Sequence, residues 1–287
     1  MLNHKKGMLF LGLLFAMSHH VLADTLPFSP QKGSVIPETF AWEPIGHIFQ
    51  NPAGVAESDL TQFKIDAGNE YLGYLPISAS LVLPVRDWVL GIGYQSFQSN
   101  DALAVDATDG RPVDHGTFTH GYQVGKVVVS KSFIPELCLG MVGTWINTQL
   151  ANTQANAFSG DLGIQWRTPD YWLGLYTRDL VTSNLQWPTT TETLTTRFEL
   201  EAGLRYEGLQ VGVAIDQDTR IAQVQLALHP DLILTGDIVT DANATPTRYS
   251  FGTILDLYFV QIHYIHSVSL NTNLAFDQNI LGITVIP

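Results

Sequence analysis

The stretch RFELEAGLRYEGLQVGVAID (residues 197–216) alternates strictly between apolar and polar positions. The apolar residues occupy even positions from Phe198 to Tyr206, and odd positions from Leu209 onward. Alternation with a period of two indicates a strand with two different faces. A two-residue turn at Glu207-Gly208 would make Tyr206 and Leu209 cross-strand partners on one side, so both strands would keep a single apolar face. The stretch therefore predicts a β-hairpin.

Similar hairpins recur along the chain, and strands near 62–70 and 279–286 flank them. The short turns fall at PVRD (84–87), SFIPE (132–136), RTPD (167–170), Glu207-Gly208, HPD (229–231) and Asp256-Leu257. Longer, more polar segments separate the hairpins, at 99–116, 151–157, 182–196, 216–219, 241–247 and 271–279. Short turns at one end and long loops at the other are typical of bacterial outer-membrane barrels. The pattern predicts an all-β protein, an antiparallel transmembrane β-barrel of about 14 strands.

Aromatic residues support this prediction. Trp88, Trp166, Tyr171, Tyr206 and Tyr258 are expected on the apolar face beside short turns, which would place them at one common height. Amphipathic rings at that height form the girdle where a barrel wall meets lipid headgroups. The alternative is an exported soluble β-sandwich whose core contains the same rings.

The composition excludes several classes of protein. Only 14% of the 287 residues are charged, against about 25% in soluble domains. The formal charge of −13 excludes the basic surface that nucleic-acid binding requires. Cys138 is the only cysteine, which excludes an intrachain disulfide and a cysteine-rich metal site.

The N-terminus predicts export. Lys5 and Lys6 precede the apolar run MLFLGLLFAM (8–17), and VLA (21–23) provides small residues before a cleavage site. This run is shorter than the roughly 20 residues that a spanning helix needs. Residues 1–23 are therefore predicted to be a signal peptide cleaved after Ala23, and the bacterial outer membrane is the expected location.

The polar face of the predicted strands indicates where a ligand could bind. The lumen-facing candidates are Arg197, Glu199, Glu201, Arg205, Asp161, Gln261 and His263. A barrel phospholipase would need a serine beside His263, but nothing in the sequence pairs Ser250 or Ser267 with it. No catalytic motif is found, so we expect no enzyme activity, no catalytic residues, no metal site and no cofactor.

A family resemblance rests on Asn51-Pro52-Ala53-Gly54, within FAWEPIGHIFQNPAGVAESDL (40–60) and shortly before the first strand. This motif resembles the N-terminal segment of FadL-like outer-membrane proteins. AFSGDLGIQW (157–166) is similar to a strand of the PorV/PorQ-type branch, and LQWP (185–188) adds a weaker likeness. The short mature chain also favours that branch.

The resemblance implies a domain organisation and a function. Residues 24–60 would form a plug-like segment in the lumen or across its periplasmic mouth, with a helical piece at 44–50 or 53–60, and 61–287 would form the barrel. A disordered periplasmic tail is the alternative for the first segment. The implied function is passage of small hydrophobic molecules; the alternative is a PorV-like secretion-accessory or protein-binding barrel. The expected partners are outer-membrane lipid and either a hydrophobic small molecule or a secretion-system protein.

Overall fold

A computed structural model describes residues 44–70, 76–108, 111–151, 153–188, 190–270 and 277–287. The predicted signal peptide, 1–23, and residues 24–43 of the predicted plug lie outside the described residues. In the described part of the chain, no helix is long and apolar enough to cross a membrane.

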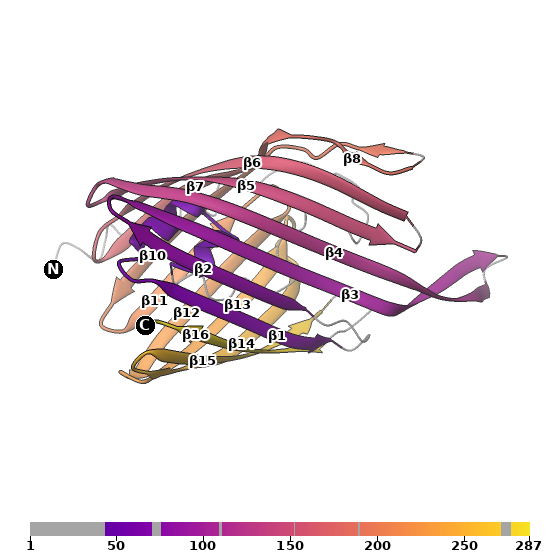
Figure 1. Cartoon of the computed structure of the whole chain (residues 1–287). Helices are drawn as coiled ribbons and strands as arrows, with labels where there is room; N and C mark the ends of the chain where they lie inside the picture. Colours follow the sequence, from indigo (N-terminus) through magenta and orange to yellow (C-terminus); the bar gives the residue numbers. More distant parts are fainter. Residues whose placement is uncertain (1–43, 71–75, 109–110, 152, 189, 271–276) are drawn as a thin grey trace.

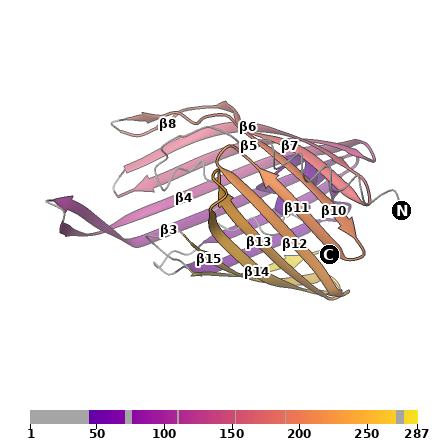
Figure 2. The same cartoon turned by 180° about the vertical axis from the view of Figure 1, so that it is seen from behind.

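Antiparallel strands form a closed β-barrel of 14 strands (Figure 1), which confirms the predicted fold class. The wall consists of β1 Gln62–Glu70, β2 Ile77–Val85, β3 Trp88–Thr108, β4 Arg111–Ile134, β5 Leu137–Leu150, β6 Thr153–Arg167, β7 Tyr171–Thr182, β10 Arg197–Tyr206, β11 Leu209–Ile215, β12 Thr219–His229, β13 Leu232–Asp241, β14 Pro246–Leu257, β15 Val260–Ser269 and β16 Asp277–Val285. Consecutive strands pair with one another, β7 pairs with β10, and β1 closes the wall by pairing with β16. Figure 2 shows the opposite wall, which β10–β15 form. Two short strands, β8 Leu185–Gln186 and β9 Thr191–Glu192, lie between β7 and β10 in the sequence.

The hairpin of residues 197–216 has the predicted register. Tyr206 pairs with Leu209, and Leu200 pairs with Ile215. Glu207 and Gly208 both have positive φ, at 44° and 85°. Two consecutive positive φ values are the signature of the turn whose twist matches that of the flanking strands, and glycine adopts such a φ without strain.

The predicted turn at Asp256-Leu257 is wrong by two residues. β14 continues to Leu257, which pairs with Val260, so Tyr258 and Phe259 form the turn. Tyr258 is 99% exposed and does not lie on the apolar face of a strand as expected. A shift of two residues leaves every side chain on the same face, so the alternation could not distinguish the two turns.

Strand residues occupy parts of several segments that were predicted as loops. β3 and β4 remain paired between Ala102–Phe118 and Thr108–Arg111, and this long hairpin extends beyond the rest of the wall (Figure 1). Thr153 pairs with Leu150, so β6 begins inside the predicted loop 151–157. The ladder bonds only backbone groups, and polar side chains therefore do not prevent strand pairing.

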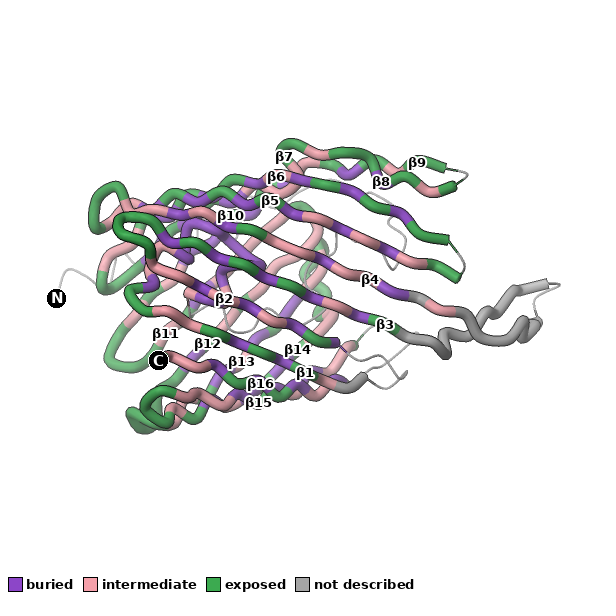
Figure 3. Tube along the Cα trace, viewed as in Figure 1, coloured by how far each residue is buried: buried purple, intermediate pink, exposed green. Residues whose placement is uncertain are grey.

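Side chains alternate in burial along the wall, as the buried and exposed segments of the strands in Figure 3 show. The outward positions are mainly apolar, and Phe198, Leu200 and Leu204 of β10 are 37–51% exposed. The inward positions of the same strand carry the buried Arg197, Glu199 and Glu201. A closed wall pairs the backbone groups of its strands, which is what a lipid environment requires.

The described part of the predicted plug, residues 44–60, contains two short 3-10 helices. These are η1 (Gly46–Ile48) and η2 (Pro52–Glu57), and they lie within the barrel near its short-turn end (Figure 1). η2 packs against β3, β4, β5 and β6. One apolar cluster joins the segment to the wall; its members are Ile45, Ile48, Phe49, Val55, Val82, Val89, Val128 and Val142.

Gly140 allows η2 to lie directly on β5. A Cβ atom there would overlap the backbone of Pro52, whereas a Cβ at Gly143, on the outward face of the same strand, meets nothing within 4 Å. We expect Gly140→Ala to destabilise the docked segment by about 1–2 kcal/mol, because overpacking forces the backbone to shift. Gly143→Ala is the matched control. Limited proteolysis of the folded protein should cut residues 44–58 faster in Gly140→Ala alone; equal rates in both variants would contradict the packing.

Candidate functional site

The seven candidate residues fall into two groups on the inner face of the wall. Arg197, Glu199, Glu201 and Arg205 lie on β10 and Asp161 lies on β6, which β7 separates from β10. Gln261 and His263 lie on β15, four strands beyond β11. Arg205 and Gln261 are partly buried, and the other five are less than 9% exposed. The structure therefore does not bring all seven together.

Two charges of β10 form ion pairs with neighbouring segments of the chain. Arg178 of β7 donates to Glu199 at 2.8 Å, and Arg197 forms an ion pair with Asp218 at 2.8 Å. Side chains two positions apart on one face of a strand are separated by about 7 Å, whereas partners on adjacent strands are closer.

Glu57 of η2 links the N-terminal segment to the β10 group. Its carboxylate lies 2.9 Å from Arg167 of β6 and 3.7 Å from Arg205. All three side chains are at most 30% exposed, so solvent screens these pairs less than it would at the surface. Neither Glu57 nor Arg167 was a sequence candidate, because no pattern in the sequence indicates that η2 reaches β6.

Asn51 makes the second link. It is fully buried, and its Nδ2 donates to Glu201 Oε1 at 2.6 Å and to the carbonyl oxygen of Ile164 at 3.3 Å. Its Oδ1 accepts from the backbone N–H of Ala53 at 3.1 Å and so caps η2. The sequence drew attention to Asn51 through the family resemblance alone, without assigning it this contact.

Asp161 stabilises an irregular part of the wall. It accepts hydrogen bonds from Tyr176 Oη at 2.9 Å and from the backbone N–H of Asp179 at 2.7 Å. The β6–β7 register shifts at this point, and Asp179 has a φ of 56°. These contacts account for the burial of Asp161, and they give it a structural role at a β-bulge.

The β15 group makes ordinary hydrogen bonds. His263 Nε2 lies 2.8 Å from Thr284 Oγ1, and Gln261 Nε2 donates to Asp256 Oδ2 at 3.1 Å. The Ser267 hydroxyl donates to that of Ser250 at 2.8 Å.

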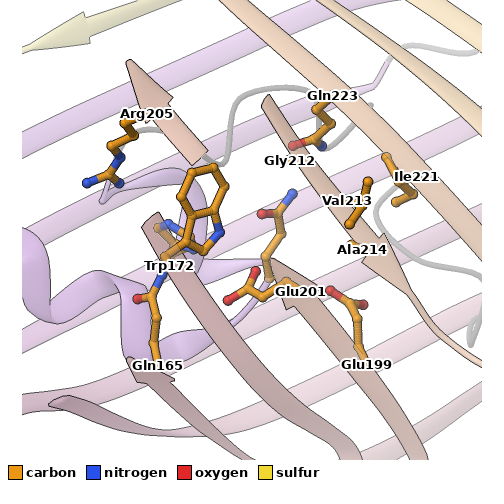
Figure 4. A pocket seen from close by; sticks show the side chains of 12 residues that line it. Gln165, Trp172, Glu199, Glu201, Arg205, Gly212, Val213, Ala214, Ile221 and Gln223 are labelled. Carbon is orange, nitrogen blue, oxygen red and sulfur yellow. The ribbon is translucent and has the colours of Figure 1, made fainter. Parts of the chain in front are cut away.

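A pocket opens between η1 and the β6–β12 part of the wall (Figure 4). Its free volume is about 30 Å³. It is lined by His47, Gln50, Gln165, Trp172, Glu199, Glu201, Arg205, Gly212, Val213, Ala214, Ile221 and Gln223. Three of the candidates, Glu199, Glu201 and Arg205, therefore meet in one place. Within the described ranges no group of His, Cys, Asp and Glu side chains could hold a metal ion.

His47 gives the docked segment a pH dependence. Burial lowers the pKa of His47 from 6.5 to about 4, the charge of Glu57 opposes this shift, and Arg205 and Arg167 add to it. The undocked segment therefore binds the proton more readily, so the stability of docking is complete above pH 6.5 and decreases as the pH falls towards 4.

We expect proteolysis of residues 44–58 to accelerate over this interval in the wild type. In His47→Gln, which cannot titrate there, the acceleration should be smaller. Identical pH profiles for the two proteins would contradict the assignment to His47.

A closed barrel with an apolar outer face and a polar inner face is the architecture of outer-membrane-type β-barrels. The comparisons with known proteins agree at the level of fold. No family model and no curated protein sequence matches the chain.

Solved structures that share the fold include the channels CymD and TodX. The CymD monoaromatic hydrocarbon channel has a TM-score of 0.60 at 11% identity, over 85% of this chain and 93% of CymD. The Pseudomonas putida toluene transporter TodX has a TM-score of 0.57 at 11% identity, over 83% of this chain and 92% of TodX. The deltaS2 mutant of the TodX channel has a TM-score of 0.59 at 11% identity, over 84% and 93%.

At 11% identity these structures show a shared fold alone, and that fold agrees with the one that the FadL-like resemblance implies. They do not favour the alternative of a secretion-accessory barrel. Assignment to the PorV/PorQ-type branch stays a prediction.

Proposed function

We propose that this chain is an outer-membrane channel that admits small, largely apolar molecules. The observation that carries the proposal is the closed 14-strand wall, apolar outside and polar inside, with residues 44–58 docked in its lumen. A wall of this kind is stable in lipid because its backbone groups are paired and its charges face inward. The fold that it shares with hydrocarbon channels supports a small molecule as the cargo.

The location can be tested before the activity. We expect the protein in the outer-membrane fraction, with a gel mobility that changes on heating, as is usual for a folded barrel. Mass spectrometry of the mature protein should find Asp24 at its N-terminus if the signal peptide is removed as proposed. Recovery from the soluble periplasm would contradict the membrane location.

Passage can be measured in cells whose outer membrane is an intact lipopolysaccharide barrier, because apolar probes cross a simple lipid bilayer unaided. We expect cells expressing the protein to take up the apolar dye N-phenylnaphthylamine faster than cells carrying the empty vector. Sensitivity to a bulky antibiotic should be unchanged, which controls for general leakage. Equal uptake in both strains, at verified expression, would contradict a channel for apolar molecules.

A further inference from the structure

The pocket of Figure 4 contains a carboxylate without a cationic partner. Glu201 is 8% exposed, and the hydrogen bond that it receives comes from the neutral amide of Asn51. Its neighbour Glu199 is paired with Arg178, but no lysine or arginine of the described ranges forms an ion pair with Glu201. A buried carboxylate usually has a positively charged or multiply donating partner, because leaving it unpaired is costly.

The opposite side of the same pocket contains an unsatisfied acceptor. Gln165 is 1% exposed, and its Oε1 atom has no hydrogen-bond partner among the described residues. Such an atom loses its bonds to water without replacing them. Gln165 and Glu201 thus both present oxygen acceptors that the folded chain leaves available.

The strand register places Gln165 and Glu201 on either side of Gly174, and both line the same pocket. Gln165 of β6 pairs with Gly174 of β7, and Gly174 pairs with Glu201 of β10. Gly174 has no side chain, and a Cβ there would overlap Glu201 Oε1 and Asn51 Nδ2. The Glu201 carboxyl group therefore lies over the glycine, beside the Asn51 amide, and points towards β6. Figure 4 shows Gln165 and Glu201 on the same side of the Trp172 ring, with Arg205 on the other side.

The chemistry of the pocket favours a positively charged hydrogen-bond donor as its ligand. Two oxygen acceptors and the adjacent Glu199 disfavour an anion, and the Arg205 guanidinium is stacked on Trp172 at 5.3 Å and paired with Glu57. A free volume of about 30 Å³ holds one or two water-sized groups. An ammonium group has this size and three donors.

We propose that the pocket binds the primary ammonium head group of an amphipathic amine, with Glu201 as its counter-ion and Gln165 as a second acceptor. The apolar remainder of the ligand then extends into the lumen. This inference rests on the proposed function, since it names the class of small molecule that the channel would admit.

Three probes of equal chain length test the proposal: n-butylammonium, n-butanol and butyrate. They differ in head-group charge and partition weakly into detergent. Isothermal titration of the purified full-length protein should detect n-butylammonium, with n-butanol and butyrate binding at least about tenfold more weakly, since a hydrogen bond to a charged group contributes about that factor.

Glu201→Gln should weaken n-butylammonium binding by at least about tenfold, because it removes the charge and keeps an acceptor for Asn51. Glu207→Gln is the matched control, because the same change on the exposed turn of this hairpin should leave affinity unchanged. If Glu201→Gln does not fold, as judged by heat-modifiable mobility, Gln165→Met tests the second acceptor and should weaken binding several-fold.

Equal affinity for n-butanol or butyrate, or unchanged affinity in the folded pocket variants, would overturn the proposal. Failure of the proposed function is distinguishable from this. Dye uptake without any preference for n-butylammonium would support the proposed channel and contradict the proposed ammonium site. Selective binding of n-butylammonium without dye uptake would support the ammonium site and contradict the channel.

Discussion

Leu200→Arg is expected to destabilise the barrel in a membrane by about 2–4 kcal/mol, the cost of a cationic side chain on the lipid face near the bilayer midplane. Leu200 lies near the middle of β10, faces outward, and pairs with the apolar Leu175 and Ile215 on the adjacent strands. An arginine there would meet hydrocarbon on every side and could reach water only by distorting the wall or the bilayer. Folding into lipid vesicles across a denaturant series would measure the loss.

The control is the same substitution at a different depth in the bilayer. Tyr206→Arg places the same residue on the same face of the same strand, beside the turn, where Tyr206 is 70% exposed. The cost there should fall to about 0–1 kcal/mol, because the side chain reaches the headgroup region. If the two variants fold into vesicles equally well, β10 does not cross a membrane, and a soluble β-sandwich-like environment becomes the better explanation of its outer face.

Asn51→Ala is expected to destabilise the folded protein by about 2–3 kcal/mol. The substitution removes the hydrogen-bond donor to the buried Glu201 and the side chain that caps η2. Asn51 is fully buried between η2 and the wall, whereas Asn147 makes a solvent-exposed bond to Asn156. Asn147→Ala should therefore change stability by no more than about 0.5 kcal/mol. Denaturant unfolding of the reconstituted protein compares the two.

The loss in Asn51→Ala should depend on the charge of Glu201. In a double-mutant cycle with Glu201→Gln, the two changes should be less than additive, since both act on one hydrogen bond. Because the contact also holds the lumen segment, Asn51→Ala should raise the single-channel ion conductance above that of the wild type. Additive stability changes together with an unaltered conductance would show that Asn51 does not hold this segment in place.

The sequence predicted which face of the wall each side chain occupies, but it did not predict all the strand ends. The sequence strongly specifies which side chains of residues 197–216 face outward. A shift of one residue in strand register would turn every apolar side chain to the other face. The turn at Tyr258-Phe259 was predicted two residues too early, because a shift of two residues leaves the same faces apolar. The extension of β3 and β4 over 99–116 was missed because backbone pairing there does not require an apolar face.

The site was predictable one side chain at a time but not as an assembly. The sequence alone assigned Glu199, Glu201 and Arg205 to the inner face, because the lipid-facing positions of β10 had to be apolar. Their partners come from elements distant in sequence, as in the contact between Asn51 and Glu201 across 150 residues. Periodicity describes one strand at a time and carries no information about such contacts.

The sequence by itself determined the barrel. Local alternation indicates the strands and their apolar outer face. The closure of the wall follows because backbone groups in lipid must be paired. What only the tertiary structure decided is the content of the lumen. Examples are the docking of residues 44–58, the pairing of Glu57 with Arg167 and the contact of Glu201 and Asn51 over Gly174. These contacts depend on which strands face one another across the lumen, and that is a property of the closed wall as a whole.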